Sequence, residues 1–467
     1  IFFIQLLMAL KKHHIKKYDG IAFPKRGDYL KQIYESLNFT LTNAQIRVLR
    51  EIRSDLKSKS PMNRLVQGDV GSGKTIVAIL TAAIIIAEEY QVALMAPTEI
   101  LAEQHYLSIK KYCECVNINC DIITSNKPQK EKKVILNKLK SGEIQFIIGT
   151  HSLIQDKVLF NNLGLIIIDE QHRFGVEHRK LLVDKGLNPE VLAMTATPIP
   201  RTLSITLHGD MDISIIDELP GHRKQVITRT IKPERLKSVY SFIAKEITKG
   251  RQCIIVYPLI METEKSDLKS AIEGHKNLSE KIFPQIQVGL LYGTMKNKEK
   301  DLVMLEFTEN KIQLLVSTTV IEVGIDIPNA TVMMVEHADR FGLTQLHQLR
   351  GRVGRGSEQS YCILVQRNYS DISQKRLSIM ERTNDGFVIS DEDLRIRGPG
   401  EFFGIKQSGF IKYKIADLVL DGSIIRSARS AAFGLVSQDP HLKKAEFREL
   451  RTYFLKHFQH MLEYVNV

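Results

Sequence analysis

Short apolar runs alternate with longer amphipathic segments along most of the chain, from about residue 40 onward. Uninterrupted apolar runs are typical of strands that are buried on both faces, whereas apolar residues spaced three and four apart predict helices. The pattern therefore predicts repeated βα units around parallel sheets. The predicted strands form two sets, which are 64–67, 92–96, 146–149, 165–168 and 191–195, and then 252–257, 288–292, 314–317, 331–335 and 361–365.

The two sets of strands predict two similar α/β domains in one chain. Pro220 and Gly221 stand between charged residues in the segment 218–225, so we expect the linker between the domains there. After about Asn368 the strand pattern fades into Gly- and charge-rich sequence, which ends in a predicted amphipathic helix at 442–465. We expect four parts, namely a leading segment 1–38, the domains 39–220 and 221–367, and a mixed helical and loop module 368–467.

The composition, with 43% hydrophobic and 25% charged residues among 467, is that of a folded chain and excludes a disordered tail. Five cysteines without a C-x-x-C pair disfavour a zinc site and favour a reducing compartment. The longest apolar stretch, 76–87, is shorter than the ~20 residues that cross a bilayer, so it predicts a buried helix. Basic residues follow the apolar start of the chain, whereas a secretory signal has its charges first. The chain begins at Ile1 and not at a methionine, so we expect a fragment of a longer chain.

The net charge is +12, and the basic excess is concentrated toward the ends of the chain. Residues 1–60 carry 12 Lys or Arg against five Asp or Glu, whereas the long middle of the chain is close to neutral. A basic periphery suits a polyanionic partner such as nucleic acid, although many soluble proteins carry this charge without such a partner. The charge alone leaves both interpretations open.

Residues 68–75, with the sequence GDVGSGKT, match the phosphate-binding pattern G-x-x-x-x-G-K-[ST]. In such a loop backbone N–H groups face a phosphate at a helix N-terminus, Lys74 would reach the β- and γ-phosphate oxygens, and the Thr75 hydroxyl would hold Mg²⁺. A predicted strand precedes the motif and a predicted helix follows it, as the motif requires. The alternative is a glycine-rich turn without a ligand. The candidate ATP-binding residues of this loop are Gly68, Gly71, Gly73, Lys74 and Thr75.

Two adjacent carboxylates, Asp169 and Glu170, follow the predicted strand 165–168 at its carboxyl end, where ligands bind in open α/β sheets. Asp169 would position Mg²⁺ through its water shell, and Glu170 would orient and activate the attacking water. The alternative is a solvated turn.

Arg352 and Arg355 are three residues apart, which would place them on one helix face in the second domain. From there they could approach the γ-phosphate and stabilise the charge that develops during phosphoryl transfer. Taken alone, the pattern Q-x-x-G-R-x-G-R could equally be a basic surface patch.

These motifs and several others resemble those of superfamily 2 helicases, and most closely the RecG family of branched-DNA translocases, over nearly the whole chain. Five further stretches carry this resemblance, namely MAPTEILAEQH (95–105), GTH (149–151), MTATPIPRTL (194–203), STTVIEVGID (317–326) and QLRGRVGR (348–355). In that family the first two contact DNA, the third couples the ATP and DNA sites, and the last two lie in the second domain.

The resemblance implies roles for further single residues. The implied nucleotide contacts outside the phosphate loop are Phe39 and Gln45 for the adenine, with Gly324 and Asp326 in the second domain. The implied DNA contacts are Thr98, Thr150 and Thr319. The residues implied to couple the two sites are Gln171, His172, Thr195, Thr197 and Gln348.

Residues 385–409 resemble the translocation motif that RecG proteins share with the transcription-repair coupling factor. In the family this segment couples closure of the ATP cleft to movement along duplex DNA. Its close glycines permit tight backbone turns, and Arg395, Arg397 and Gln407 can hydrogen-bond to neighbouring loops or phosphates. The alternative is a plain structural loop.

The resemblance implies two tandem RecA-like P-loop domains that bind ATP and Mg²⁺ between them and drive movement on double-stranded and branched DNA. In the family this activity remodels stalled replication forks and Holliday junctions in DNA repair and recombination. The implied setting is a cytoplasmic, nucleoid-associated bacterial monomer that has no membrane partner and has single-strand DNA-binding protein as a further partner. Complete members also carry an N-terminal wedge domain built around an OB-fold. We therefore expect residues 1–38 to be the remnant of a linker whose apolar start is left partly exposed.

Two other functions fit parts of the pattern. The first is the motor portion of a transcription-repair coupling factor, which would displace stalled RNA polymerase. The second is a non-enzymatic nucleotide-binding switch. A switch has little use for both a water activator, Glu170, and an arginine finger, Arg355, so the pair favours an enzyme.

Overall fold

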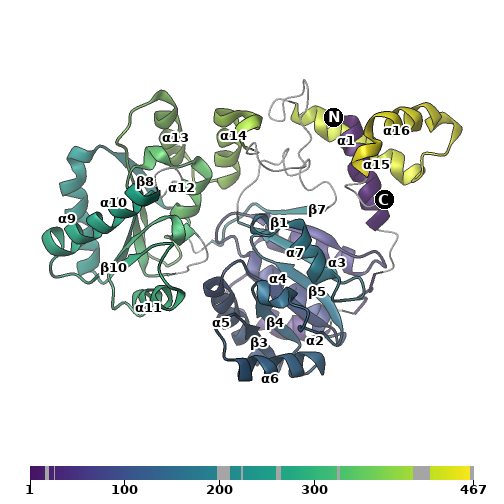
Figure 1. Cartoon of the computed structure of the whole chain (residues 1–467), viewed down its shortest axis with the longest axis horizontal. Coiled ribbons are helices and arrows are strands. Elements are labelled where there is room, and N and C mark those ends of the chain that lie inside the picture. The colour runs from purple at the N-terminus through teal and green to yellow at the C-terminus, as the bar shows by residue number, and fades with distance from the viewer. Residues whose placement is uncertain are drawn as a thin grey trace. The chain divides into compact units, whose positions relative to one another are not determined.

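The computed structural model describes residues 1–15, 20–25, 27–196, 211–221, 224–258, 264–322, 327–402 and 421–462. The chain forms two compact units, each taken by itself below (Figure 1). Over these described ranges, no helix has both the length and the apolar character needed to cross a membrane. The first unit comprises Ile1–Gly68, Gly73–Glu218 and Arg397–Val467, and the second comprises Asp69–Ser72 and Leu219–Ile396.

The first unit is built around a seven-stranded parallel sheet with the strand order β3-β4-β2-β5-β6-β1-β7 (Figure 1). All five strands predicted in this part of the chain are present, which confirms the βα pattern. The two edge strands, β3 and β7, were not predicted. The strands are β1 (Asn63–Gly68), β2 (Gln91–Met95), β3 (Cys120–Ile123), β4 (Phe146–Gly149), β5 (Leu163–Ile168), β6 (Glu190–Thr195) and β7 (Asp212–Ile216).

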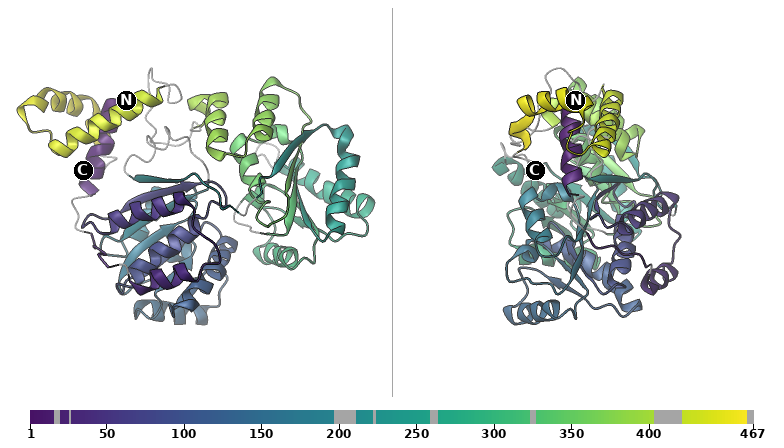
Figure 2. Two further views of the ribbon diagram at one scale, coloured as in Figure 1. Left: turned by 180° about the vertical axis from the view of Figure 1, so that it is seen from behind. Right: turned by 90° about the vertical axis from the view of Figure 1, so that its right-hand side faces the viewer.

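Helices cover both faces of this sheet (Figures 1 and 2). Every residue of α4 except Thr75 is buried, so the apolar stretch 76–87 is a core helix, as predicted. The helices are α2 (Asp28–Glu35), α3 (Asn43–Leu56), α4 (Lys74–Ile86), α5 (Glu99–Cys115), α6 (Gln129–Lys140) and α7 (Val176–Val183), with the 3₁₀ turns η1 (His151–Ile154) and η2 (Gln171–Arg173).

The second unit contains a six-stranded parallel sheet with the order β10-β11-β9-β12-β13-β8. Its five predicted strands are all present, and only the edge strand β8 was not predicted. The two parallel sheets confirm the predicted α/β fold class. The strands are β8 (Ile227–Ile231), β9 (Gln252–Val256), β10 (Val288–Leu291), β11 (Leu314–Ser317), β12 (Ala330–Val335) and β13 (Tyr361–Val365).

The helices of the second unit follow its strands in the same alternating way. They are α9 (Leu236–Thr248), α10 (Glu264–Asn277), α11 (Asn297–Thr308), α12 (Leu343–Arg350), α13 (Asp371–Arg382) and α14 (Gly386–Phe402), of which α14 belongs to this unit as far as Ile396. The short turns are η3 (Pro233–Arg235), the π-helical turn η5 (Leu278–Ile282), η6 (Thr319–Glu322) and η7 (Ala338–Arg340).

A buried glutamine stabilises the same place in both sheets. Gln91 begins β2, and its Nε2 donates to the carbonyls of Leu139 and Ile144 at 2.8 and 2.7 Å. Gln252 begins β9, and its Nε2 donates to two carbonyls at and beyond the end of α11, at 2.5 and 2.8 Å. Each side chain thereby donates to two backbone carbonyls, one at the end of a neighbouring helix and one just beyond it. The same hydrogen-bonding arrangement in both sheets agrees with the prediction of two similar domains.

The apolar start of the chain packs against the C-terminal helices, and Phe2, Phe3 and Leu10 stay half-buried, in agreement with a partly exposed start. Helix α1 (Phe2–Ile15) packs against α15 (Gly422–Gln438) and α16 (Arg448–Leu462), and Figure 2 shows α1 beside these C-terminal helices. Leu6 is fully buried in a core that it shares with residues of both C-terminal helices. An ion pair between Lys12 and Asp212 also joins α1 to β7. The apolar residues of 1–10 therefore pack against a partner from the other end of the sequence.

Two features of the C-terminal third differ from expectation. Residues 386–402 form the helix α14 and not the tight turns that the glycines suggested, because one side of α14 is anchored by buried residues that include Ile389 and Leu394. The last helix begins after the 3₁₀ turn η8 (Ala445–Phe447) and not at residue 442. Asp439 explains this later start, since its carboxylate accepts a hydrogen bond from the Lys444 N–H at 2.7 Å and holds a turn there.

Candidate nucleotide and nucleic-acid sites

The predicted phosphate loop joins β1 to α4 at the carboxyl end of the first sheet. The buried Lys74 ammonium donates to the Gly68 carbonyl at 2.8 Å. Gly73 has the left-handed φ of +84°, and a Cβ there would lie 2.2 Å from Gln45 Nε2. Only glycine meets both conditions. The loop therefore brings its glycine, its lysine and the N–H groups at the start of α4 to one place, which suits a phosphate.

Gln45, the predicted adenine contact, lies beside this loop because α3 begins with a capping box. Its Oε1 accepts from the Thr42 N–H at 2.9 Å, and its own N–H donates to the Thr42 hydroxyl at 3.2 Å. These bonds fix the side chain with Nε2 against Gly73. Phe39 lies just ahead with 38% of its surface exposed, so its ring is accessible. Gly71, with a φ of +76°, belongs to the short segment that groups with the second unit.

Asp169 follows β5 and is buried next to the phosphate-loop lysine. Its N–H donates to the Met95 carbonyl at 3.0 Å, and its Oδ2 lies 2.7 Å from His105 Nε2. Burial by itself would raise the pKa of Asp169, but the hydrogen bond and charge of His105 and the charge of Lys74 outweigh it and lower the pKa. The carboxylate therefore stays ionised in a buried position, which is the state that binds a cation.

Glu170 occupies a strained backbone position, with a φ of +50° in the left-handed region. Its Oε2 accepts from the N–H of Ala196, just beyond β6, at 3.2 Å. The fold thus places the acidic pair next to the first residues of the motif 194–203. Thr195, which belongs to this motif, is the last residue of β6 and is buried. Backbone strain that persists at a strand end is typical of functional sites.

His105 is a residue that sequence reasoning missed. It lies on α5, inside the motif 95–105, and is buried against Asp169. A histidine on the buried side of a helix most often satisfies a core hydrogen bond, so its residue type alone carries no signal of a functional role. Only the fold shows that its partner is the candidate Mg²⁺ ligand.

We expect His105→Leu to reduce ATP hydrolysis about tenfold, because a hydrogen bond to a charged group contributes roughly 1.5–3 kcal/mol. His105→Gln should keep most of the activity, since its amide can donate to the same carboxylate. Phosphate release measured over a range of Mg²⁺ concentrations checks this result. His275→Gln is the matched control, because among the residues that the structure describes His275 bonds to the Val288 carbonyl, in the second unit. Equal rates for His105→Leu and the wild type at every Mg²⁺ concentration would exclude the role.

The predicted DNA contacts lie at the carboxyl ends of parallel strands. Thr98 caps α5, with its hydroxyl accepting from the Leu101 N–H at 3.3 Å, and Thr150 directly follows β4. The strands β2 and β4 are neighbours, so these two threonines share one edge of the first sheet. Thr319 begins η6 after β11 in the second unit. A cap explains Thr98 without DNA, and a phosphate contact stays a prediction for all three.

The two arginines of the sixth motif do not share a helix face, so that prediction is wrong. Helix α12 ends at Arg350, and both Arg352 and Arg355 lie in the turn that follows it. Gly354 has a φ of +79°, which a helix cannot contain. Arg352 is buried, whereas Arg355 is half-buried and donates from Nε to the Gly351 carbonyl at 3.2 Å. Their role toward a nucleotide stays a prediction.

The predicted coupling residues belong to several different elements. Gln171 is buried in η2 and donates to Met211 Sδ at 3.3 Å, and Gln348 is buried in α12. On α14, Arg395 is exposed and pairs with Glu392 at 2.6 Å, whereas Arg397 is half-buried. His172 belongs to η2, and its side chain is not described. Four predicted residues lie outside the described residues, namely Thr197, Gly324, Asp326 and Gln407.

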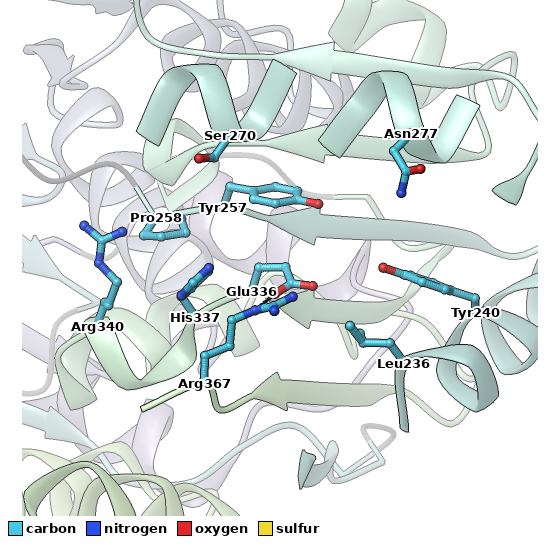
Figure 3. Close-up of a pocket in the computed structure, with 10 residues that line it drawn as sticks. All are labelled: Leu236, Tyr240, Tyr257, Pro258, Ser270, Asn277, Glu336, His337, Arg340 and Arg367. Carbon is cyan, nitrogen blue, oxygen red and sulfur yellow. Dashed lines mark hydrogen bonds and ion pairs between the residues drawn. The ribbon is translucent and has the colours of Figure 1, made fainter. Parts of the chain in front are cut away.

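A cavity of about 350 Å³ in the second unit is lined by none of the predicted residues (Figure 3). Tyr257, Glu336 and Arg367 line it, and each follows a central strand, β9, β12 or β13, at its carboxyl end. The buried Glu336 accepts from Arg367 Nε at 3.1 Å. Burial and then the Glu336 charge raise the pKa of Tyr240, another lining residue, to about 12. The rule that ligands bind beyond strand carboxyl ends could have pointed to these groups.

Three parts of the chain match known protein families. Residues 42–205 match the DEAD/DEAH box helicase family, and residues 232–357 match the helicase conserved C-terminal domain. Residues 383–462 match the C-terminal part of domain 3 of the ATP-dependent DNA helicase RecG. With the two parallel sheets and the phosphate loop, these matches define a superfamily 2 helicase fold.

Relatives of the chain narrow this class. The chain is 50% identical over 450 residues to the ATP-dependent DNA helicase RecG of Bacillus subtilis (strain 168), which covers 96% of this chain and 66% of that protein. It is 48% identical over 457 residues to the RecG helicase of Streptococcus pneumoniae, covering 98% and 68%. A solved structure of RecG bound to a three-way DNA junction matches with a TM-score of 0.75 and 44% identity, over 91% of this chain and 55% of that chain.

This chain belongs to the RecG family of helicases. It spans about half to two thirds of the length of the relatives that it matches. Its match to the RecG-specific third domain is independent of the general helicase motifs, because it lies beyond both of them in the sequence.

Proposed function

We propose that this chain is an ATP-driven motor that moves on double-stranded DNA and remodels branched DNA in repair and recombination. The observation that carries the proposal is the grouping of Lys74, Asp169 and Glu170 at the carboxyl end of the first sheet, in a chain of the RecG family. A lysine for phosphates, an aspartate for a cation and a glutamate for water are what ATP hydrolysis requires.

The residues present fit ATP and Mg²⁺. Gly73 leaves the space beside Gln45 that a Cβ would fill, and the N–H groups at the start of α4 can receive a phosphate. Thr75 and Asp169 would hold the cation. Among the residues described, no group of three or more His, Cys, Asp or Glu could hold a metal by itself. This agrees with Mg²⁺, which proteins bind through one or two side chains together with the phosphates of the nucleotide.

Each side chain then has a defined task. Lys74 neutralises phosphate charge, Glu170 accepts a proton from the attacking water, and His105 holds Asp169 in place. Bound Mg²⁺ supplies charge neutralisation on the phosphates. Arg352 and Arg355 remain the proposed source of positive charge from the second unit. The proposed coupling residues remain Gln171, His172, Thr195, Thr197, Gln348, Arg395, Arg397 and Gln407.

Double-stranded and branched DNA are the proposed partners. The basic ends of the chain suit a polyanion, and the threonines at strand ends suit backbone phosphates, which position a duplex without reading its sequence. The relative solved with a three-way DNA junction supports the same class of partner. We further propose a bacterial, cytoplasmic, nucleoid-associated monomer, with single-strand DNA-binding protein as an additional partner.

Two alternatives predict different results. The motor of a transcription-repair coupling factor would displace stalled RNA polymerase, and the match to RecG domain 3 disfavours it. A nucleotide-binding switch would bind ATP with little turnover, and the placement of Glu170 at the candidate Mg²⁺ ligand disfavours that. The deciding experiment measures ATP hydrolysis with no DNA, single-stranded DNA, duplex and forked DNA. We expect duplex and forked DNA to stimulate hydrolysis most, and turnover that no DNA stimulates would refute the motor.

The affinity for duplex DNA should fall steeply as salt increases and should vary little with base sequence, because phosphate contacts dominate. A protein that contacts six or more phosphates loses roughly a thousandfold in affinity between 50 and 200 mM salt. Fluorescence anisotropy with several unrelated duplexes measures both trends. A flat salt response, or a strong preference for one sequence, would contradict contacts of this kind.

A further inference from the structure

The cavity of the second unit occupies the place that the candidate nucleotide site has in the first unit. The central strands have the same order, with β5 between β2 and β6, and β12 between β9 and β13. Glu336 directly follows β12 as Asp169 follows β5, and the N–H of each donates to the last residue of the next strand, at 2.8 and 3.0 Å. The residue after each acid, His337 or Glu170, has a φ of +50°, and a 3₁₀ turn follows. The cavity that Glu336 and His337 line is therefore the structural equivalent of the site around Asp169.

This equivalent site lacks the groups that hold a triphosphate and its cation. Leu236, the first residue of α9, lines the cavity, whereas Lys74 is the first residue of α4 in the phosphate site. The connection from β8 to α9 has the sequence KPER (232–235), which contains no glycine and has no N–H at its proline. Arg367 Nε donates to Glu336 Oε2 at 3.1 Å, so a guanidinium already neutralises this carboxylate, as a cation would. The cavity thus suits a ligand that has neither a triphosphate nor Mg²⁺.

The pair Glu336 and Arg367 keeps hydrogen-bonding capacity that its surroundings do not use. Glu336 is 2% exposed, yet among the described residues its Oε1 accepts no hydrogen bond. A buried charged oxygen without a donor is costly and uncommon. The terminal nitrogens of Arg367 likewise donate to no group in the part of the chain that the structure describes. An acceptor and several donors therefore lie side by side at one wall of the cavity (Figure 3).

Two tyrosines form other walls of the cavity. Tyr257 follows β9 and Tyr240 lies on α9, and both are half-buried. Within the described residues neither hydroxyl has a hydrogen-bond partner, although a buried tyrosine hydroxyl usually finds one. Burial raises the pKa of both phenols, and the charge of Glu336 adds to the rise, so both hydroxyls stay protonated at neutral pH and can donate. Gly274 on α10 leaves room for Tyr257, since a Cβ there would lie 2.3 Å from its hydroxyl oxygen.

His337 supplies a further neutral group. Burial and then the charge of Arg367 lower the pKa of His337, and the charge of Glu336 offsets only part of this, so the imidazole is uncharged at neutral pH. An uncharged imidazole has one donor and one acceptor nitrogen. The left-handed backbone of His337 is unusual outside glycine, and strain of this kind is typical of functional sites.

We propose that this cavity binds one unpaired nucleobase with its sugar, as a second site of the nucleotide type that needs neither a triphosphate nor Mg²⁺. Its volume of about 350 Å³ is at the lower end of the roughly 300–1,000 Å³ of small-molecule sites, which suits one base and its sugar. The rings of Tyr257 and Tyr240 stack on the base, as aromatic side chains do on single strands. Glu336 accepts an N–H of the Watson–Crick edge and Arg367 donates to the acceptor beside it.

The base can come from a free nucleoside or from an unpaired nucleotide at a DNA branch. In a duplex the Watson–Crick edge is already paired, so duplex bases are not ligands. The inference goes beyond the proposed function, because binding of a free nucleoside requires neither ATP hydrolysis nor movement. Only a DNA source of the base rests on the proposed function.

The first test uses 2-aminopurine deoxyriboside, whose fluorescence is quenched when its base stacks on an aromatic ring. A saturating non-hydrolysable ATP analogue with Mg²⁺ occupies the first site. The wild type should quench the probe, and Tyr257→Leu should weaken binding about tenfold or more, because stacking on the ring is lost. Tyr240→Phe keeps its ring and loses one hydroxyl, so it should weaken binding about threefold. The control Tyr34→Leu, at an exposed tyrosine of α2, should bind as the wild type does.

Affinities of Tyr257→Leu and Tyr240→Phe equal to that of the wild type would overturn the inference. Tyr240→Phe changes a single oxygen, so its result decides the matter even if Tyr257→Leu does not fold. The quenching that depends on Tyr257 should persist when a chelator removes Mg²⁺, since Arg367 takes the place of the cation. A requirement for Mg²⁺ would contradict the proposed site.

Forked DNA with 2-aminopurine at an unpaired position beside the branch distinguishes the two sources of the base. Quenching of this DNA that Tyr257→Leu abolishes identifies a DNA strand as the source, and quenching of the nucleoside alone identifies a free nucleoside. The absence of any Tyr257-dependent quenching with both probes would refute the inference. DNA-stimulated ATP hydrolysis, measured on the same preparations, tests the proposed function separately, because its loss would refute the motor and leave the nucleoside result unchanged.

Discussion

Glu170→Gln should lower the rate of DNA-stimulated ATP hydrolysis 100-fold or more and leave nucleotide binding close to normal. A glutamine oxygen can still accept the Ala196 N–H that now bonds to Glu170, so the local geometry is kept. The amide cannot take a proton from the attacking water, and loss of a positioned base typically costs 10²–10⁴ in rate. Single-turnover phosphate release, beside titration of a fluorescent nucleotide, separates the two effects.

The companion variant Lys74→Ala should weaken nucleotide binding itself, which Glu170→Gln should leave close to normal. Lys74 is held at the phosphate loop by the Gly68 carbonyl, and its positive charge acts on Asp169. Glu177→Gln, an exposed glutamate in the first turn of α7, is the matched control for both measurements. Hydrolysis by Glu170→Gln within tenfold of the wild type would remove Glu170 from the catalytic role. Unchanged nucleotide affinity in Lys74→Ala would place the phosphates elsewhere.

The strands that the sequence predicts and those that it misses differ in their place in the sheet. All ten predicted strands are real, and most lie between two neighbours, so they are uninterrupted apolar runs. The three unpredicted strands, β3, β7 and β8, all lie at sheet edges. One side of an edge strand faces solvent or a loop, so the strand mixes buried and exposed residues, as β8 does with the sequence ITRTI. An apolar run does not reveal such a strand, whereas the edge strand β10 is itself apolar, with the sequence VGLL, and was predicted.

The candidate ATP site could be predicted where its residues are contiguous in sequence. The phosphate loop and the pair Asp169 and Glu170 each form a short motif, and the fold brings them together. His105 could not be assigned, because it lies 64 residues from its partner Asp169 and only the packing of α5 against the end of β5 joins them. The packing of α1 was missed for the same reason, since its partners α15 and α16 lie at the opposite end of the chain.

Local backbone geometry decided the other differences. The spacing of Arg352 and Arg355 fits a helix, but Gly354 takes a positive φ and a Cβ there would lie 2.8 Å from Val226 Cγ2. The turn is thus fixed by a contact with another segment. Conversely, the glycines of 386–402 tolerate a helix because buried residues on one side of α14 hold it against the rest of the unit. Residue type permits both conformations at each site, and tertiary contacts select one.

The buried Glu190 makes the stability of the first unit depend on pH. It begins β6 at the end of the sheet opposite the phosphate loop, its Oε2 accepts from the Met62 N–H, and within the described residues its Oε1 has no hydrogen-bond partner. Burial raises the pKa of this carboxyl to about 8, the Met62 N–H lowers it in part, and the charge of Asp55 adds to the rise. At neutral pH the folded protein therefore holds a proton here that the unfolded chain releases.

The free energy of unfolding of this unit should accordingly fall as pH rises from about 5 to 8, by about 1.4 kcal/mol per pH unit from this one group. The sign follows because the folded state binds more protons than the unfolded state between the two pKa values. For a unit of this size, each kcal/mol moves the thermal midpoint by roughly 2–4 °C. Glu190→Gln is uncharged and has one donor group and one acceptor oxygen, as the protonated acid has, so its thermal midpoint should match the wild type near pH 5 and exceed it by several degrees at pH 8. Calorimetry at pH 5, 6, 7 and 8 measures this difference, with Glu131→Gln on the exposed side of α6 as the control. If the thermal midpoints of the wild type and Glu190→Gln changed in the same way with pH, the carboxylate would be ionised in the folded protein and another group would neutralise it.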